Sequence, residues 1–212
     1  MRHLSPLDHF LGAIDQSLRT VYAKPATTAR PNPATGLPEA ELSDDERHLT
    51  GRLLRIDHAG EVAAQGLYQG QAITARDAGI REQMRRSADE ENDHLSWCEA
   101  RLEATGAHKS YLNPFWYWGS FGIGALAGIA GDRWSLGFVD ETEQQVVRHL
   151  DDHLARLPQD DQRSRAVLVQ MREDEAHHAH KARTAGAAKL PAPIRGLMRV
   201  VSKVMTATAE RI

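Results

Sequence analysis

The chain has 212 residues, a length that fits a single domain with a well-filled core. Its formal net charge of −3 at pH 7 excludes the strongly basic surface expected of a nucleic-acid-binding protein. The single cysteine, Cys98, excludes an internal disulfide, a cysteine-ligated zinc site and a cysteine-ligated iron–sulfur cluster, and favours a reducing compartment. Asp8 and Asp15 interrupt the apolar pattern at the N-terminus, which therefore predicts no secretory signal.

The first 42 residues predict a helix followed by a linker. Ser5 and Pro6 have the form of a helix start, and apolar residues follow at helical spacing, so we expect an N-terminal amphipathic helix within residues 1–22. Residues 23–42 are rich in proline, alanine and threonine, a composition that sustains neither helix nor sheet. We expect this segment to be a poorly ordered linker.

Residues 43–190 contain four long stretches with helical periodicity. The first begins at the capping-box pattern Ser43 to Glu46 and continues to about Asp77. The second covers 80–105 and ends at Gly106, and the third covers 134–157 and is stopped by a proline. The fourth is predicted over 159–185. Each stretch carries an apolar stripe, as a helix in the core of a bundle requires.

Two short stretches repeat one pattern, Glu91-Asn-Asp-His94 and Glu175-Ala-His-His178. Residues three apart lie on one face of a helix, so each stretch presents a carboxylate beside an imidazole. One helix upstream of each pair, a glutamate occupies a gap in the apolar stripe, and these two residues are Glu61 and Glu143. The repetition predicts a duplicated helical hairpin. A buried carboxylate needs a partner, which these residues would give one another.

Helical position decides between neighbouring candidates. Glu141 shares its face with polar residues, so Glu143 is the predicted ligand on this helix. By the same argument His178 is preferred over His177. Four carboxylates with two imidazoles suit iron or manganese, and helical bundles with this ligand set hold two metal ions. The predicted ligands are Glu61, Glu91, His94, Glu143, Glu175 and His178.

Other polar residues lie near the predicted site. Asp174 could accept a hydrogen bond from the outer nitrogen of His94, or be an exposed charge. His149 and Tyr68 project near the level of the site, where each either lines a substrate pocket or is a satisfied core residue. His58 lies one turn from Glu61, and we interpret it as a core or interhelical hydrogen-bonding group rather than as a residue of the site. The remaining histidines of this region are expected in solvent: His153, His177 and His180.

Two apolar segments point to a membrane surface. Residues 111–131 carry no charge and are rich in aromatic residues, but their glycines and early proline argue against a plain spanning helix. We expect a membrane-facing crossover between the two hairpins. Residues 191–212 place apolar side chains on one side of a helix and Arg195, Arg199 and Lys203 around the other, as expected at an anionic surface.

The stretch Asp57-His-Ala-Gly-Glu61, the two Glu-x-x-His pairs, Glu143 and the apolar crossover resemble the demethoxyubiquinone hydroxylase family of ubiquinone biosynthesis. The similarity extends from about Leu49 to the C-terminus. It implies an all-α, ferritin-like four-helix bundle with additional N-terminal and C-terminal amphipathic helices. It also implies a di-iron monooxygenase, in which the six predicted ligands hold two iron ions. A family histidine near the metal corresponds to His149, whereas the tyrosine that follows it in some members is Leu150 here.

The resemblance further implies the substrates and the location. A polyprenyl demethoxyubiquinol would gain a ring hydroxyl group from dioxygen, with the chain bound peripherally to the cytoplasmic face of a bacterial inner membrane through 111–131 and 191–212. It leaves open a homo-oligomer or association with other proteins of ubiquinone biosynthesis. The competing interpretations are a ferritin-type iron store and a non-catalytic membrane quinone-binding protein.

Overall fold

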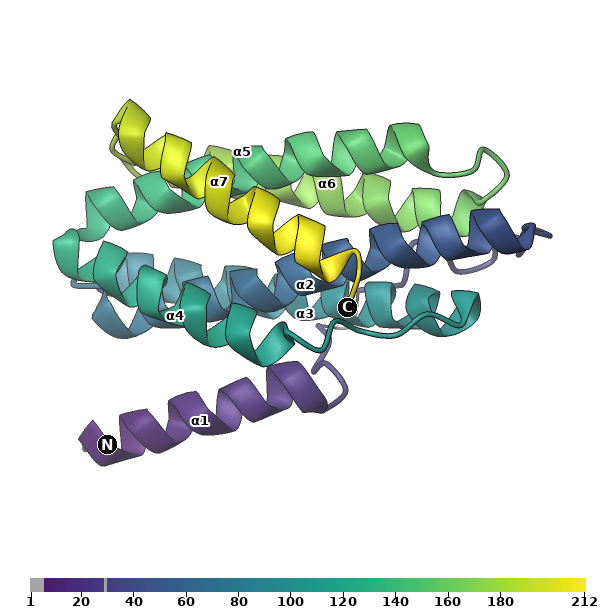
Figure 1. Ribbon diagram of the computed structural model, residues 1–212. Coiled ribbons are helices and arrows are strands. Elements are labelled where there is room, and N and C mark those ends of the chain that lie inside the picture. The colour runs from purple at the N-terminus through teal and green to yellow at the C-terminus, as the bar shows by residue number, and fades with distance from the viewer. Residues whose placement is uncertain (1–5, 29) are drawn as a thin grey trace.

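The computed structural model describes residues 6–28 and 30–212, and within them the chain forms seven helices and no strand (Figure 1). The prediction of an all-helical fold is confirmed. The predicted cap Ser5 lies outside the described residues. The helices are α1 Pro6–Tyr22, α2 Asp44–Thr74, α3 Ala78–Thr105, α4 Asn113–Ala130, α5 Asp132–Arg156, α6 Gln162–Thr184 and α7 Ala192–Ala209.

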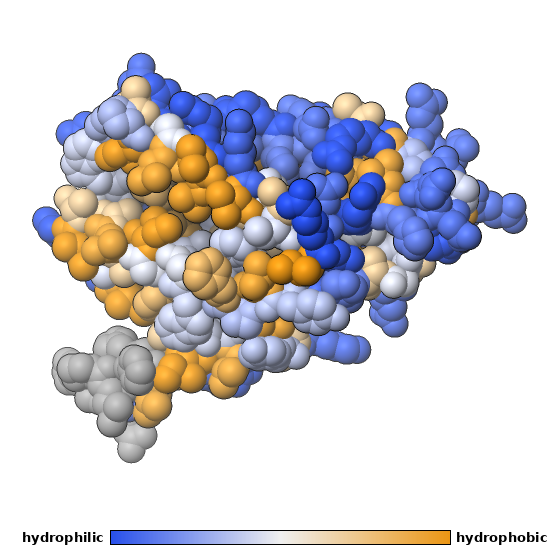
Figure 2. Space-filling view, viewed as in Figure 1, coloured by the Kyte–Doolittle hydropathy of each residue, from blue (hydrophilic) through white to orange (hydrophobic). Residues whose placement is uncertain are grey.

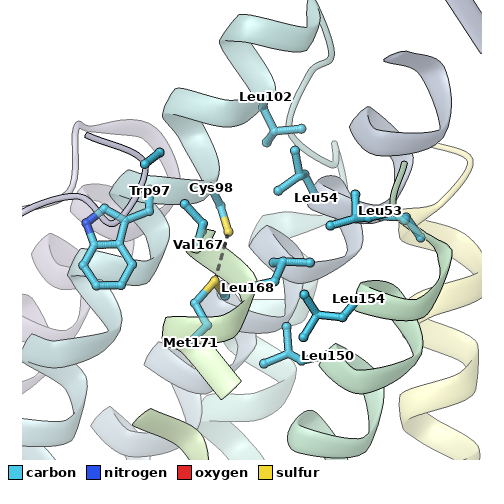
Figure 3. Packing of buried hydrophobic residues seen from close by; sticks show 12 residues of the cluster. Leu53, Leu54, Trp97, Cys98, Leu102, Leu150, Leu154, Val167, Leu168 and Met171 are labelled. Atoms are coloured by element: carbon cyan, nitrogen blue, oxygen red, sulfur yellow. Dashed lines mark hydrogen bonds between the residues drawn. The ribbon is translucent and has the colours of Figure 1, made fainter. Parts of the chain in front are cut away.

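Four of these helices form a bundle of two hairpins, α2 with α3 and α5 with α6, and α3 also packs against α6. An apolar layer fills one end of the bundle, where the Cys98 thiol donates to the Met171 sulfur at 3.7 Å (Figure 3). A second apolar layer, around Tyr68, Met84 and Leu136, fills the other end. The predicted ligands lie between the two layers along every helix, so apolar packing closes the site at both ends.

Capping aspartates explain where the observed helix ends differ from those expected. The first long helix ends at Thr74 rather than near Asp77, because the Asp77 carboxylate accepts from the Ile80 amide and caps α3. Helix α6 begins at Gln162 rather than 159, because Asp161 caps it through the Ser164 amide at 3.0 Å. The predicted capping box that opens α2 is present. A capping aspartate continues the polar pattern of a helix, so periodicity alone predicts a helix that is a few residues too long.

The crossover between the hairpins is the continuous helix α4, which packs along α2. The glycines of α4 do not interrupt the helix. Instead, glycines of α4 and α2 permit close contact between the backbones of these two helices. A methyl group at Gly124 would lie 2.2 Å from the Leu67 carbonyl oxygen, and one at Gly66 would lie 2.2 Å from the Tyr117 carbonyl oxygen. No helix in residues 6–28 and 30–212 has the length and hydropathy needed to cross a membrane.

The segment 23–42 contains no helix among its described residues, and side chains of the bundle hold it in place. The Glu39 carboxylate receives two bonds from the guanidinium of Arg101 on α3, at 2.8 and 2.9 Å. The Arg163 side chain on α6 donates to the Leu37 carbonyl at 2.7 Å. The segment is therefore held against the α3 and α6 side of the bundle.

Helix α7 lies across the opposite side of the bundle, in contact with α2 and α5 (Figure 1). Much of its apolar side is open: Leu197 is 64% exposed and Val204 is 53% exposed. In α4, Leu126 and Ile129 are exposed as well. Figure 2 shows hydrophobic patches over α7 and α4 on one face of the molecule.

Candidate metal centre

The six predicted ligands meet in the middle of the bundle. Each of the six is at most 3% exposed. Helices α2 and α5 each contribute one glutamate, and α3 and α6 each contribute a Glu-x-x-His pair. Four of the six place a ligand atom within 4.8 Å of one another: Glu61, Glu91, His94 and Glu175.

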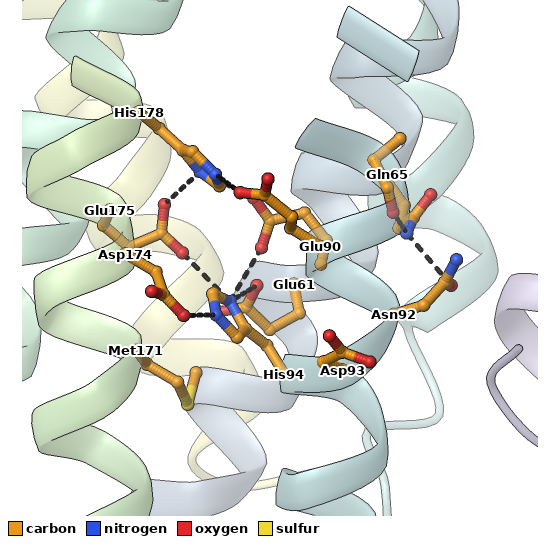
Figure 4. A network of polar contacts seen from close by, with 12 residues as sticks. Glu61, Gln65, Glu90, Asn92, Asp93, His94, Met171, Asp174, Glu175 and His178 are labelled. Atoms are coloured by element: carbon orange, nitrogen blue, oxygen red, sulfur yellow. Dashed lines mark hydrogen bonds and ion pairs between the residues drawn. The ribbon is translucent and has the colours of Figure 1, made fainter. Parts of the chain in front are cut away.

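Both histidines direct the same ring nitrogen toward the carboxylates (Figure 4). His94 Nδ1 lies 2.9 Å from Glu91 Oε2, 3.2 Å from Glu175 Oε1 and 3.4 Å from Glu61 Oε2. His178 Nδ1 lies 3.2 Å from Glu91 Oε1 and 3.3 Å from Glu175 Oε2. Glu91 and Glu175 therefore contact both histidines and occupy the middle of the cluster.

Glu143 lies at the His178 side, outside the tight group of four. Its Oε1 accepts a hydrogen bond from the buried Tyr68 hydroxyl at 2.5 Å. The Tyr68 ring meets the His178 ring edge to face, with centroids 6.3 Å apart. Glu141 bonds to Gln145 at 2.9 Å instead, which agrees with the choice of Glu143 as the inward-facing residue.

The outer nitrogen of each histidine contacts an acid from the opposite hairpin. His94 Nε2 lies 2.9 Å from Asp174 Oδ2, which is one of the two alternatives that the sequence left open for Asp174. His178 Nε2 lies 2.6 Å from Glu90 Oε2, a contact that the sequence analysis missed. Its signal was present, because Glu90 precedes Glu91 just as Asp174 precedes Glu175. Such carboxylate partners orient a ligating imidazole and fix which nitrogen faces the metal.

The electrostatics of the cluster favour positive charge among the carboxylates. Burial raises the pKa of Glu61 well above its usual range, and the charge of Glu91 raises it further. Burial and the charge of Glu175 likewise raise the pKa of Glu143 well above its usual range. Glu61 Oε2 and Glu91 Oε1 are buried and make no hydrogen bond of good geometry, although imidazole nitrogens lie 3.4 and 3.2 Å from them, and buried carboxylate atoms without good partners are costly. The donor set and these orphaned atoms fit bound divalent metal ions.

A largely apolar cavity of about 330 Å³ adjoins the cluster. Helices α2, α4, α5 and α7 line it, and Glu61 forms part of its wall. Asp57 and His149 are other ionisable groups of this wall, and the α7 side is formed by residues such as Leu197 and Val201. The cavity thus joins the carboxylate cluster to the apolar face of α7.

The histidines around the cavity only partly match expectation. His149 lines the cavity, whereas Tyr68 does not and is bonded within the core. The prediction that His153 lies in solvent is wrong: it is fully buried, with Nδ1 2.7 Å from Asp57 Oδ1. Its ring centroid is 4.2 Å from that of His149. Periodicity could not show this, because the buried partner comes from another helix.

The other histidine predictions agree with the structure. His58 is fully buried, with its ring nitrogens 3.4 Å from Glu99 Oε1 and 3.4 Å from Asn113 Nδ2. Its surroundings are therefore those of an interhelical hydrogen-bonding group. His177 and His180 are exposed on α6.

A helical bundle whose four long helices bring buried glutamates and histidines together defines a candidate metalloprotein of the ferritin-like type. Comparison with known proteins agrees, since residues 48–209 match the family model described as Ubiquinone biosynthesis protein COQ7. The chain belongs to this family, and the resemblance inferred from the sequence is confirmed.

Curated relatives align over almost the whole chain. A protein of Nitrosococcus oceani named 3-demethoxyubiquinol 3-hydroxylase is 58% identical over 208 residues, covering 98% of this chain and 97% of the relative. A protein of the same name from Stutzerimonas stutzeri is 55% identical, covering 100% of this chain and 98% of the relative. Another from Aromatoleum aromaticum is 50% identical, covering 97% of this chain and 100% of the relative. The prediction of an enzyme of this kind agrees with these names.

Proposed function

We propose that the chain is a di-iron monooxygenase that hydroxylates the ring of a polyprenyl demethoxyubiquinol with dioxygen. The observation that carries the proposal is the junction at Glu61, which belongs both to the carboxylate–histidine cluster and to the wall of the apolar cavity. A ring in the cavity would therefore lie next to the metal centre. Family membership and the names of the relatives support the same reaction.

The six buried ligands would hold two iron ions, with Glu91 and Glu175 between the two histidines. Bound iron supplies the activation of dioxygen that ring hydroxylation requires. The protein residues hold the site in place. Asp174 and Glu90 orient the imidazoles, Tyr68 fixes Glu143, and the apolar layers at both ends of the bundle exclude water.

The cavity would bind and orient the substrate. Its apolar wall suits a substituted ring, and its volume of about 330 Å³ falls in the usual range for small-molecule sites. Asp57 and His149, together with uncharged polar residues of the wall such as Thr142 and Gln145, could hydrogen-bond to the ring oxygens. His153 contacts Asp57 from behind the wall, which fixes the carboxylate.

We further propose that α4 and α7 bind the surface of the bacterial inner membrane on its cytoplasmic face. Exposed apolar residues of both helices lie together on one side of the molecule (Figure 2). Arg195, Arg199 and Lys203 accompany them on α7, as expected of a helix at an anionic lipid surface. Because the cavity is lined by α7, a prenyl tail could remain in lipid while the ring reaches Glu61.

The reaction can be tested with purified protein, reduced demethoxyubiquinone and isotopically labelled dioxygen. We expect about two iron ions per chain and label in the new ring hydroxyl group. Glu143→Gln, which removes a ligand from one side of the site, should lower the iron content and abolish the labelled product, whereas the matched control Glu141→Gln, two residues away on α5, should retain both. Hydroxylation by metal-free protein, or unlabelled product, would reject the proposal. A large assembly that stores many iron ions per chain would instead indicate a ferritin-type function.

A further inference from the structure

We infer that Arg30, in the non-helical segment 23–42, is a positioning residue for the metal centre and acts on His94 through Asp174. The inference rests on the proposed function, because it concerns one side of the proposed di-iron site. It assigns a role to a segment that lies outside the bundle, in which composition indicates only a linker.

The first step is a continuous chain of contacts from the segment to the centre. The Arg30 guanidinium forms an ion pair with Asp174 Oδ2, and the same oxygen lies 2.9 Å from His94 Nε2. The other Asp174 oxygen accepts from Gln170 Nε2 at 3.0 Å. Both oxygens of this half-buried carboxylate are thereby held, so Arg30 and Gln170 fix the acid that orients His94. Figure 4 shows the contact of Asp174 with His94.

The second step is that the segment holds α3 on both sides of His94. The Thr28 amide and hydroxyl donate to the two oxygens of Asp93 at 2.8 and 2.6 Å, and the Asp93 side chain is fully buried. The Arg30 guanidinium lies 5.0 Å from the centre of the Trp97 ring, in cation–π geometry. Trp97 in turn lies beside His94, with ring centroids 5.4 Å apart. The position of Arg30 is therefore fixed by its surroundings.

The surroundings of the other histidine, His178, do not include the described part of the N-terminal segment. Glu90, which contacts His178, has Lys181 Nζ 3.6 Å from its second oxygen. Both Glu90 and Lys181 belong to helices of the bundle, and Lys181 is on the same helix as His178. Among the described residues, only the His94 side shows an outer acid paired with a cation from the N-terminal segment. Displacing the segment would loosen one half of the centre and leave the other intact.

The size of the effect follows from known metal sites. Loss of an outer partner that orients a ligating histidine typically costs about 10–100-fold in metal affinity or activity. Arg30 acts one bond further out, through Asp174, so we expect Arg30→Ala to weaken one of the two metal positions by about tenfold. Arg30→Lys keeps the charge but loses the planar fork, and we expect a smaller loss.

The test measures metal binding by the full-length protein, without turnover. Cobalt(II) binding to the metal-free protein is measured by competition with a chromophoric chelator, for the wild type, Arg30→Ala and Arg30→Lys. We expect two binding steps in the wild type, one of them weakened about tenfold in Arg30→Ala, with partial rescue in Arg30→Lys. Equal cobalt(II) affinities in the wild type and Arg30→Ala would overturn the inference.

Arg163→Ala is the matched control. The Arg163 and Arg30 side chains are similarly exposed, at 35% and 31%, and Arg163 also holds the segment, through Leu37 and Glu39. Arg163 does not contact Asp174, so its removal should leave both cobalt(II) steps unchanged. Equal weakening in Arg163→Ala, with equal lowering of the unfolding temperature of the metal-free proteins, would show a merely structural role and refute the positioning role. Failure of the wild type to bind cobalt(II) would instead reject the proposed function.

Discussion

The two sides of the candidate metal centre are built from the same sequence pattern but have different surroundings. At the His94 side, Glu61 faces the cavity and the outer acid Asp174 is held from the N-terminal segment. At the His178 side, Glu143 is bonded to Tyr68 in the core, and the outer acid Glu90 lies near a lysine of the bundle. The duplicated pattern thus produces one side that opens on a candidate substrate cavity and one that is closed.

The largest expected effect comes from a residue shared by both sides. Glu91 contacts both histidines, so Glu91→Ala should remove a ligand from each metal and lower cobalt(II) affinity by more than about 100-fold, beyond the range for outer partners. Chelator competition measures this. His94 and His178 hold the pKa of Glu91 well below its usual range against the effect of burial, so the metal-free variant should also unfold at a lower temperature than the wild type. A variant that still binds two cobalt(II) ions tightly would contradict the shared position of Glu91.

The outer acids allow each side to be weakened separately. Asp174→Ala and Glu90→Ala should each reduce affinity at one metal position by about 10–100-fold, because each leaves one imidazole without its orienting carboxylate. The double variant should weaken both binding steps. If either single variant weakened both steps equally, the two sides would not be independent. Glu141→Ala serves as the control, since that side chain bonds to Gln145 on its own helix.

The raised carboxyl pKa values predict how binding depends on pH. Burial raises the pKa of Glu61 and of Glu143, so the metal-free protein retains protons at pH values where an ordinary glutamate is ionised. A cation must displace these protons, so affinity should fall as the pH is lowered, by about tenfold per pH unit for each proton released. Proton release on adding cobalt(II) in weakly buffered solution measures this directly. Affinity that rises as the pH falls would contradict the shifts.

The smallest effects should distinguish the open side from the closed side. His149→Ala removes a polar group from the cavity wall and should raise the KM for the quinol by about tenfold or less, with unchanged metal content. Tyr68→Phe should leave KM unchanged but destabilise the protein by about 1–3 kcal/mol, because Glu143 loses a buried hydrogen-bond donor. Steady-state kinetics and thermal unfolding would test the pair. An increase in KM for Tyr68→Phe would place substrate on the closed side.

Local periodicity was sufficient to identify the helices and the inward-facing residues of the bundle. Two Glu-x-x-His pairs and two glutamates in apolar stripes indicated which six side chains would face inward, and the structure brings these six together. The contact of Asp174 with His94 followed from the same logic. Glu90 could have been found in this way, because it occupies the equivalent position in the repeat.

The remaining features depend on contacts between segments that are distant in the sequence. Nothing in the local pattern around His153 indicates that Asp57 of another helix buries it, or that the glycines of α4 serve contact with α2. The same holds for Arg30, whose partners on α3 and α6 are more than 60 residues away. The sequence by itself determined the helices and the six inward-facing acids and histidines, because helical spacing is a local property of the chain. Only the tertiary structure decided which side of the centre opens on the cavity and which acid the N-terminal segment holds, because both follow from the packing of the connecting segments.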